Sequence, residues 1–280
     1  MSKGLRGIEA GKTSICTVGE TESDLLYRGY NVTDLSQNCV FEEVCFLLLN
    51  GKLPNSLELK DFTKKIFSKR HIPKSLISVL EKIPKETNPM DVLRTTCSFL
   101  GNIEPEKSFD NQIKCAERLL GILPSALNYW YHFSHLGKRI VIENDSESIA
   151  GHFLSTLHGR KATETEEKVM NVSLILYAEH EFNASTFAAR VCAATLSDFY
   201  SCVTGAIGTL RGPLHGGANE KAMELISRFE DEESAAKSIY SMLENKELIM
   251  GFGHAVYKKQ DPRNDIIKKW SKKLSVGRPN

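Results

Sequence analysis

Apolar side chains recur every three to four positions along most of this chain, which is the spacing of amphipathic α-helices. Glycine and proline mark where several of these segments stop. One segment begins at Phe41 and runs into Asn50, Gly51 and Pro54, a combination typical of a helix end. A further helix is predicted over residues 89–100, with Gly101 as its end. The other predicted helices cover residues 56–68, 73–83, 111–135, 145–157, 164–179 and 184–207.

Strand patterns are short and lie near the N-terminus. Residues 13–30 hold two β-prone runs around a turn of Gly, Glu and Thr, which predicts a small hairpin. Sustained strand patterns are absent from the rest of the sequence, so a parallel sheet with a dinucleotide site is not expected. The predicted fold class is mainly α.

The composition changes near residue 211. The sequence RGPLHGGANE brings proline, histidine and paired glycines together, and amphipathic segments follow it. Clustered helix breakers between periodic segments favour a hinge. We therefore predict a large helical domain over residues 1–215 and the start of a smaller domain over residues 216–280.

Charge and composition exclude several classes of partner. The 36 basic and 35 acidic residues give a net charge of +1, which provides no overall basic field for nucleic acid or an anionic membrane. The sequence has no apolar run long enough to span a bilayer and no secretory signal. The seven cysteines are scattered without CxxC spacing, which indicates reduced thiols. We expect a soluble protein of the cytoplasm.

Three histidines lie in polar or glycine-rich breaks between apolar segments. His180 lies in AEHEFNAST, His215 in GPLHGGANE and His254 in GFGHAVYKKQDPR. An imidazole in such a position can donate a hydrogen bond to a carbonyl or transfer a proton near neutral pH. Arg263 follows His254 by nine residues and can bind a carboxylate through two hydrogen bonds. These four residues are the candidate site.

Simpler interpretations of these residues remain open. Each histidine alone can be a hydrogen-bonded structural residue, and the three together can bind a metal, although they lack a local spacing such as HxxxH. Glu179, Glu181 and Asn183 can cap a helix junction instead of contributing to a site. Arg70, in SKRHIP, has the context of a surface charge. The GFGH sequence by itself is weak evidence for a phosphate loop.

The motifs together resemble the citrate synthase family. GPLHGGANE and GFGHAVYKKQDPR are similar to its two catalytic-histidine segments, and AEHEFNAST is similar to its oxaloacetate-binding segment. The resemblance extends over nearly the whole chain and implies a two-domain helical fold. PMDVLRT, YWYHFSHLGKRI and DSESIAGHFLSTLHG resemble the 2-methylcitrate synthase branch, while a citrate synthase with mixed acyl-CoA use remains the alternative.

The resemblance also implies roles for individual residues. His215 would hydrogen-bond the thioester carbonyl, and His254 would polarise the ketone of oxaloacetate. His180 and Arg263 would hold oxaloacetate, with Arg70 as a further substrate contact. The implied coenzyme A site is the backbone of Leu248, Ile249, Met250, Gly251 and Phe252.

The implied reaction joins propionyl-CoA, oxaloacetate and water to give 2-methylcitrate and CoA. It passes through an enol or enolate of the thioester and a citryl-CoA-type intermediate. It uses no metal and no redox cofactor, since CoA enters as the acyl-CoA substrate. The implied assembly is a homodimer, and the alternatives are acetyl-CoA as substrate or a non-catalytic homologue.

The chain departs from the family pattern at its C-terminus. It ends in KKLSVGRPN soon after the DPR motif, whereas the resemblance implies a longer chain. The expected remainder supplies the aspartate that removes the α-proton and two further arginines. Asp261 and Asp265 are not assigned that role, because the first belongs to the DPR motif and the second to the helix that follows it.

Overall fold

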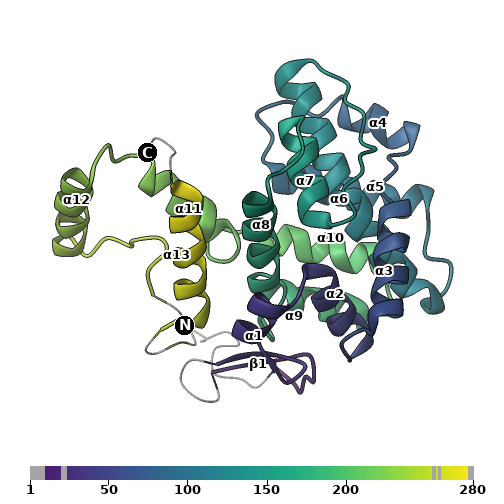
Figure 1. The fold of residues 1–280 in the computed structure, drawn as a ribbon, viewed down its shortest axis with the longest axis horizontal. Helices are drawn as coiled ribbons and strands as arrows, with labels where there is room; N and C mark the ends of the chain where they lie inside the picture. The colour runs from purple at the N-terminus through teal and green to yellow at the C-terminus, as the bar shows by residue number, and fades with distance from the viewer. Residues whose placement is uncertain (1–9, 20–23, 254–256, 258–259, 277–280) are drawn as a thin grey trace.

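The computed structural model describes residues 10–19, 24–253, 257 and 260–276. This part of the chain is mainly helical, as predicted, with three short strands at its N-terminal end (Figure 1). The helices are α1 (Val32–Asn38), α2 (Phe41–Asn50), α3 (Ser56–Ser68), α4 (Lys74–Leu80), α5 (Pro89–Ile103), α6 (Gln112–Leu136), α7 (Ile149–His158), α8 (Glu164–Leu176), α9 (Ala184–Ala193), α10 (Phe199–Leu210), α11 (Gly217–Ile226), α12 (Glu232–Glu244) and α13 (Pro262–Ser275). A 3-10 turn, η1 (Phe109–Asn111), precedes α6.

The N-terminal strands form a small antiparallel sheet. Strands β1 (Cys16–Val18), β2 (Leu25–Tyr27) and β3 (Tyr30–Asn31) follow one another in order, and Cys16 pairs with Tyr27. The hairpin prediction is confirmed for the strands, while residues 20–23 lie outside the described residues. The buried hydroxyl of Tyr27 donates to the carbonyl of Ile175 at 3.0 Å, so the sheet is fixed to the end of α8.

Three apolar clusters hold the helices together, the smallest of them formed by Cys45, Phe62, Ile66 and Ile149. The largest joins α4, α5, α6 and α10 and includes the buried side chains of Leu100, Ile122 and Trp130. The second lies between the sheet, α1, α2 and α8. Burial of this apolar area is the main term that stabilises such a fold.

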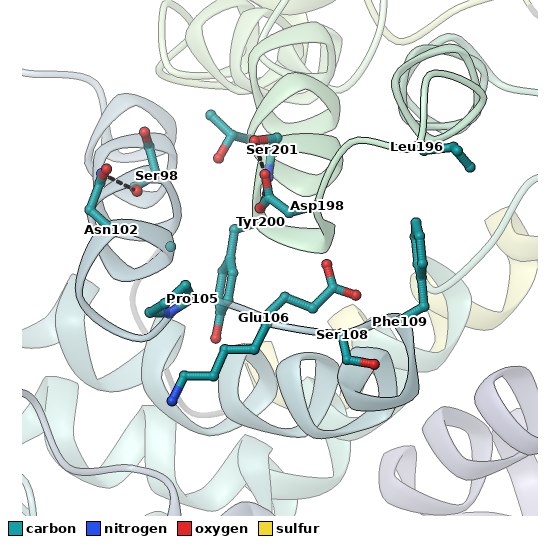
Figure 2. A pocket seen from close by; sticks show the side chains of 13 residues that line it. Ser98, Asn102, Pro105, Glu106, Ser108, Phe109, Leu196, Asp198, Tyr200 and Ser201 are labelled. Carbon is teal, nitrogen blue, oxygen red and sulfur yellow. Dashed lines mark hydrogen bonds between the residues drawn. The ribbon is translucent and has the colours of Figure 1, made fainter.

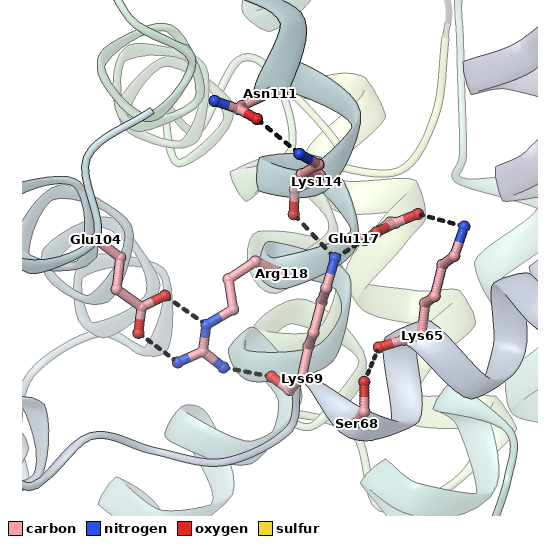
Figure 3. Close-up of polar contacts among 8 residues, drawn as sticks. All are labelled: Lys65, Ser68, Lys69, Glu104, Asn111, Lys114, Glu117 and Arg118. Carbon is pink, nitrogen blue, oxygen red and sulfur yellow. Dashed lines mark hydrogen bonds and ion pairs between the residues drawn. The ribbon is translucent and has the colours of Figure 1, made fainter. Parts of the chain in front are cut away.

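A polar network fixes the ends of α3 and α5 to α6 (Figure 3). Arg118 on α6 donates to both carboxylate oxygens of Glu104, at 2.7 and 2.8 Å, and to the carbonyls of Lys69 and His71. The ammonium of Lys69 pairs with the buried carboxylate of Glu117. The chain after α5 is therefore held in place by charge-assisted hydrogen bonds.

The structure corrects the prediction of one helix over residues 184–207. α9 ends at Ala193 and α10 begins at Phe199, and the two helices pack against each other. Leu196 has φ +61°, which ends a right-handed helix, and the Asp198 side chain accepts from the backbone N–H of Ser201 as an N-cap. The run of small residues continues through this segment, so the sequence pattern did not indicate the break.

The structure also corrects the predicted end of α5 at Gly101. This glycine lies inside the helix, which continues to Ile103. A Cβ at Gly101 would lie 2.8 Å from the Cβ of Tyr200 on α10, so glycine here permits close packing of α5 against α10. The N-terminal end of α7 is corrected too, from residue 145 to Ile149, because Ser148 caps it.

A pair of glycine substitutions tests this packing. Gly101→Ala should lower the free energy of unfolding by about 1–3 kcal/mol, because the added methyl group overpacks the contact with Tyr200. Gly205→Ala, on the exposed side of α10 with no atom within 4 Å of the new Cβ, should raise it by roughly 0.5–1 kcal/mol. Urea unfolding of both variants measures the difference. Equal effects would contradict the packing described for Gly101.

A buried histidine makes stability depend on pH. The amide nitrogen of Asn144 lies 3.0 Å from Nδ1 of His152, and Nε2 lies 2.9 Å from the Ser125 hydroxyl oxygen. Because an amide NH₂ only donates, Nδ1 is an acceptor and Nε2 carries the proton. Burial, with a smaller contribution from Arg70, lowers the pKa of His152 from 6.5 to about 3. The imidazole is therefore neutral in the folded protein.

We expect the free energy of unfolding to fall as the pH falls below 6.5. The unfolded state then binds a proton on His152 that the folded state does not, so the slope reaches about 1.4 kcal/mol per pH unit. Urea unfolding at pH 6.5, 6.0, 5.5 and 5.0 measures this slope. His152→Gln should flatten it, whereas the exposed His158→Gln should leave it unchanged. An unchanged slope in His152→Gln would contradict the assignment.

The last three helices differ in how they contact the rest of the described chain (Figure 1). α11 and α12 lie to one side, whereas α13 packs against α1 and α8. Ile266, Ile267 and Trp270 of α13 contact the apolar cluster of the sheet and α8. The domain division at 215/216 stays a prediction. Within the described residues, helices with the length and hydropathy of a membrane span are not found.

Candidate active site

His215 lies in the tight turn between α10 and α11. The backbone N–H of His215 donates to the carbonyl of Gly212 at 2.9 Å, and the next two residues are glycines. A Cβ at Gly216 would lie 2.6 Å from the carbonyl oxygen of Leu210, and one at Gly217 would lie 2.5 Å from that of Arg211. The glycines are therefore required by close backbone approach, which fixes the position of His215.

The His215 ring contacts the N-terminal end of α9. The backbone N–H of Ser185 donates to Nε2 of His215 at 3.2 Å, and the Ser185 hydroxyl oxygen lies 2.9 Å from the same nitrogen. A backbone N–H can only donate, so Nε2 is an acceptor and the ring proton lies on Nδ1. Nδ1–H is thus the hydrogen-bond donor that His215 can offer to a substrate.

The surroundings of His215 favour its neutral form. Burial lowers the pKa of this imidazole below its ordinary value. The ring also faces the first turn of α9, where unpaired N–H groups carry partial positive charge and disfavour an imidazolium. Asn183 caps this helix, since its side-chain oxygen accepts from the backbone N–H of Thr186 at 3.0 Å. The capping interpretation of Asn183 is confirmed.

His180 lies in the loop between α8 and α9, which Tyr27 and Glu179 hold in shape. The backbone N–H of Glu179 donates to the Tyr27 hydroxyl at 3.4 Å, and the Glu179 carboxylate accepts from the backbone N–H of His180 at 2.9 Å. Glu181 has φ +58°, an uncommon conformation for a residue other than glycine. The loop thereby turns the His180 ring toward Tyr257, whose hydroxyl lies 3.1 Å from Nε2.

Arg263 lies in the first turn of α13. Its guanidinium forms a two-pronged contact with the carboxylate of Asp261, the N-cap of that helix, with Nε and Nη2 at 2.9 and 2.6 Å from the two oxygens. Burial raises the pKa of the Tyr257 phenol, and the charge of Arg263 opposes that shift. His180 therefore contacts Tyr257, from which 77 positions of the sequence separate it, and Tyr257 precedes Arg263 by six positions.

His254 and Arg70 were also predicted to contribute to the site. His254 lies outside the described residues, so its role stays a prediction. Arg70 is buried at the end of α3, where its guanidinium donates to the carbonyls of Ser146, Glu147 and Ser148. These contacts join α3 to the loop before α7 and do not include the residues around His180 or His215. The structure therefore gives Arg70 a structural contact, and its substrate contact stays a prediction.

The predicted coenzyme A segment forms a turn after α12. Ile249 is buried, whereas the side chains of Leu248 and Phe252 are exposed. Gly251 has φ +93° and a Cβ there would lie 3.3 Å from Ala222 on α11, so the turn lies against α11. Met250 is half-buried. The backbone of this turn remains the predicted binding element.

The structure adds two contact residues that the sequence did not indicate. Ser185 orients His215, and Tyr257 meets His180. Ser185 had a possible signal, because it follows the helix cap Asn183 by two residues and its N–H belongs to the unpaired first turn. Tyr257 had none. Among the described residues, which exclude His254, clusters of three or more metal-binding side chains are not found.

Comparison with known proteins supports the same class. The family model "Citrate synthase, C-terminal domain" matches residues 4–279. A 2-methylcitrate synthase of Shewanella oneidensis is 58% identical over 98% of this chain and 73% of its own length. Citrate synthase 2 of Bacillus subtilis is 39% identical over 98% of this chain and 74% of its own length.

A solved structure shows the same fold. It is the ternary complex of a citrate synthase from Thermoplasma acidophilum with carboxymethyl coenzyme A and oxaloacetate, with a TM-score of 0.91 and 33% identity. The match covers 100% of this chain and 74% of that one. The chain therefore belongs to the citrate synthase family, a family of condensing acyltransferases. The predicted family, helical fold and enzyme class are confirmed.

Proposed function

We propose that this protein condenses propionyl-CoA with oxaloacetate and water to give 2-methylcitrate and CoA. The observation that carries the proposal is the neutral His215, with its proton on Nδ1 and its Nε2 held by Ser185. The 58% identity to a protein named 2-methylcitrate synthase supports propionyl-CoA as the substrate. Citrate formation from acetyl-CoA is the second candidate, supported by the relative named citrate synthase 2.

His215 is proposed to act on the thioester. A C–H beside a thioester carbonyl is a weak acid, so negative charge on the carbonyl oxygen must be stabilised as the proton leaves. The Nδ1–H of a neutral imidazole is a suitable donor, because its position is fixed before the reaction. The resulting enol or enolate carbon then attacks the ketone carbon of oxaloacetate.

His180 and Arg263 are proposed to hold oxaloacetate. The guanidinium of Arg263 already binds a carboxylate in its planar two-pronged geometry, that of Asp261. A substrate carboxylate would share or compete for this group. His180 would bind an oxygen of oxaloacetate, and His254 would polarise the ketone and protonate the new alkoxide.

The remaining parts of the proposal concern groups beyond the described site. The backbone of residues 248–252 would bind coenzyme A, and a carboxylate base outside these 280 residues would remove the α-proton. Water then cleaves the thioester of the citryl-CoA-type intermediate, so the carbon product and CoA leave as separate molecules. The chemistry requires no metal and no redox cofactor, and we propose a homodimer as the active assembly.

Oxaloacetate-dependent release of CoA tests the proposal. The assay compares the 280-residue chain with an extended chain that continues with the remaining part of the Shewanella oneidensis relative. Thiol release from propionyl-CoA by the extended chain, only when oxaloacetate is present, is the expected result. An extended chain that folds but releases CoA from neither propionyl-CoA nor acetyl-CoA would show that the proposed function is wrong.

A further inference from the structure

The N-terminal end of α5 lies beside the turn that carries His215. α5 and α10 pack against each other, and Gly101 near the end of α5 meets Tyr200 near the start of α10, so the two helices run antiparallel. Figure 2 shows this end of the pair, with Ser98 and Asn102 on α5 beside Tyr200 of α10. At the opposite end of the pair, the start of α5 therefore reaches the end of α10.

A carboxylate in the first turn of α5 binds the residue that ends α10. Asp91, in the PMDVLRT motif, accepts a hydrogen bond at 2.8 Å from Nε of Arg211, the C-cap of α10. The side chain of Asp91 is 20% exposed, and it also pairs with Arg94 at 3.0 Å, one turn along α5. This charge-assisted hydrogen bond fixes the end of α10 to the start of α5.

The helix that follows the His215 turn is held from the same place. Asn88 caps α5, since its side-chain oxygen accepts from the backbone N–H of Met90 at 2.9 Å. Its NH₂ group donates to both carboxylate oxygens of Glu220, in the first turn of α11, at 3.1 and 3.2 Å. The start of α5 thus contacts the chain on both sides of His215.

The backbone between Arg211 and the His215 turn is tightly packed. The N–H groups of His215 and Gly217 both donate to the carbonyl of Gly212, at 2.9 and 3.1 Å. A Cβ at Gly217 would lie 2.5 Å from the carbonyl oxygen of Arg211. Packing this close transmits a displacement from one group to the next. A shift of Arg211 would therefore move the His215 ring relative to Ser185, which belongs to α9.

We propose that Asp91 is a positioning residue, which acts through Arg211 to keep the His215 ring in contact with Ser185. This role rests on the function proposed for His215. Ion pairs with an exposed partner contribute little to stability, and the Arg211 side chain is 43% exposed. A misplacement of about 1 Å at a reacting group can nevertheless lower a rate on the order of 10²-fold. The effect of Asp91 should therefore appear in catalysis more than in stability.

NMR of the 280-residue chain with ¹⁵N-labelled histidine tests the contact without requiring activity. The ring signals of His215 are assigned by their loss in His215→Gln. In the native chain we expect a proton on Nδ1, because the N–H of Ser185 donates to Nε2. Asp91→Asn should give a mixture of the two tautomers, because the ring leaves that donor. Arg139→Gln removes an exposed arginine from its pair with Glu81 and should leave the His215 signals unchanged.

Kinetics of the extended chain test whether Asp91 acts through His215. Asp91→Asn should lower kcat for CoA release about tenfold, with the KM for oxaloacetate nearly unchanged. In a His215→Ala background the same substitution should change kcat by less than about twofold, because an effect that acts through His215 is already lost. Arg211→Gln should lower kcat as much as Asp91→Asn, and the double variant should fall no further.

Three results would overturn the proposal. The first is a native tautomer of His215 in both Asp91→Asn and Arg211→Gln. The second is native kcat in folded Asp91→Asn. The third is an equal loss of kcat with and without His215, which a purely structural role of Asp91 predicts. Failure of the proposed function is distinguishable, because it would appear as native kcat in His215→Ala or as no CoA release, whereas the tautomer does not depend on catalysis.

Discussion

Replacing His215 with alanine should lower kcat of the extended chain by about 10²–10³-fold, the usual cost of losing one donor to a developing oxyanion. The fall should appear in kcat and in kcat/KM alike, because the hydrogen bond strengthens only as charge develops on the thioester oxygen. The fold should survive, since the His215 ring lies in a turn and belongs to none of the three apolar clusters. Steady-state CoA release with saturating oxaloacetate measures the effect.

An exposed histidine provides the matched control. His158→Ala lies at the end of α7, away from Ser185 and His180, and should retain native kcat. Ser185→Ala should lower kcat by less than His215→Ala, because the backbone N–H of residue 185 still holds Nε2. If His215→Ala kept native kcat, the role proposed for the Nδ1 proton would be wrong.

Arg70→Met should lower the free energy of unfolding by about 3–5 kcal/mol, because three carbonyls lose hydrogen bonds from a charged donor, each worth roughly 1.5–3 kcal/mol. Burial lowers the pKa of Arg70 to about 10, and the buried carboxylate of Glu42 opposes that shift. Without the guanidinium, the carboxylate of Glu42 loses the favourable electrostatic interaction with Arg70. The carbonyls of residues 146–148 lose their donors as well. Urea unfolding of the 280-residue chain measures the loss.

This variant also decides between the two interpretations of Arg70. A structural role predicts a large loss of stability with the KM for oxaloacetate nearly unchanged under conditions where the extended chain is folded. A substrate contact predicts a small loss of stability and a raised KM for oxaloacetate. Arg139→Met, which removes an exposed arginine paired with Glu81, is the control and should cost less than about 1 kcal/mol.

The sequence predicted those elements whose ends are determined locally. The prediction for α3 matched the structure at both ends, and its start is determined locally, because Asn55 caps the helix and Glu58 completes a capping box. α2 stops where the sequence predicted, at Gly51, which has φ +81°. In each case the signal lies within a few residues of the boundary.

The errors arose where a distant element decides the local structure. Gly101 resembles a helix end in sequence but serves the contact with Tyr200, about a hundred positions away. The break at Leu196 allows α9 to pack against α10, and the run of small residues in this segment does not predict that packing. The site shows the same division, because the motifs identified His215 and His180, whereas the contact between His180 and Tyr257 was not predicted, since 77 positions separate the two residues.

A competition between two substrates tests the central claim most directly. The extended chain is supplied with oxaloacetate and equal concentrations of propionyl-CoA and acetyl-CoA, and mass spectrometry measures the two tricarboxylic acids formed. Their ratio equals the ratio of kcat/KM for the two acyl-CoAs. We expect 2-methylcitrate to predominate, with its formation lost in His215→Ala. A predominance of citrate, or the formation of neither acid by a folded protein, would contradict the proposed function.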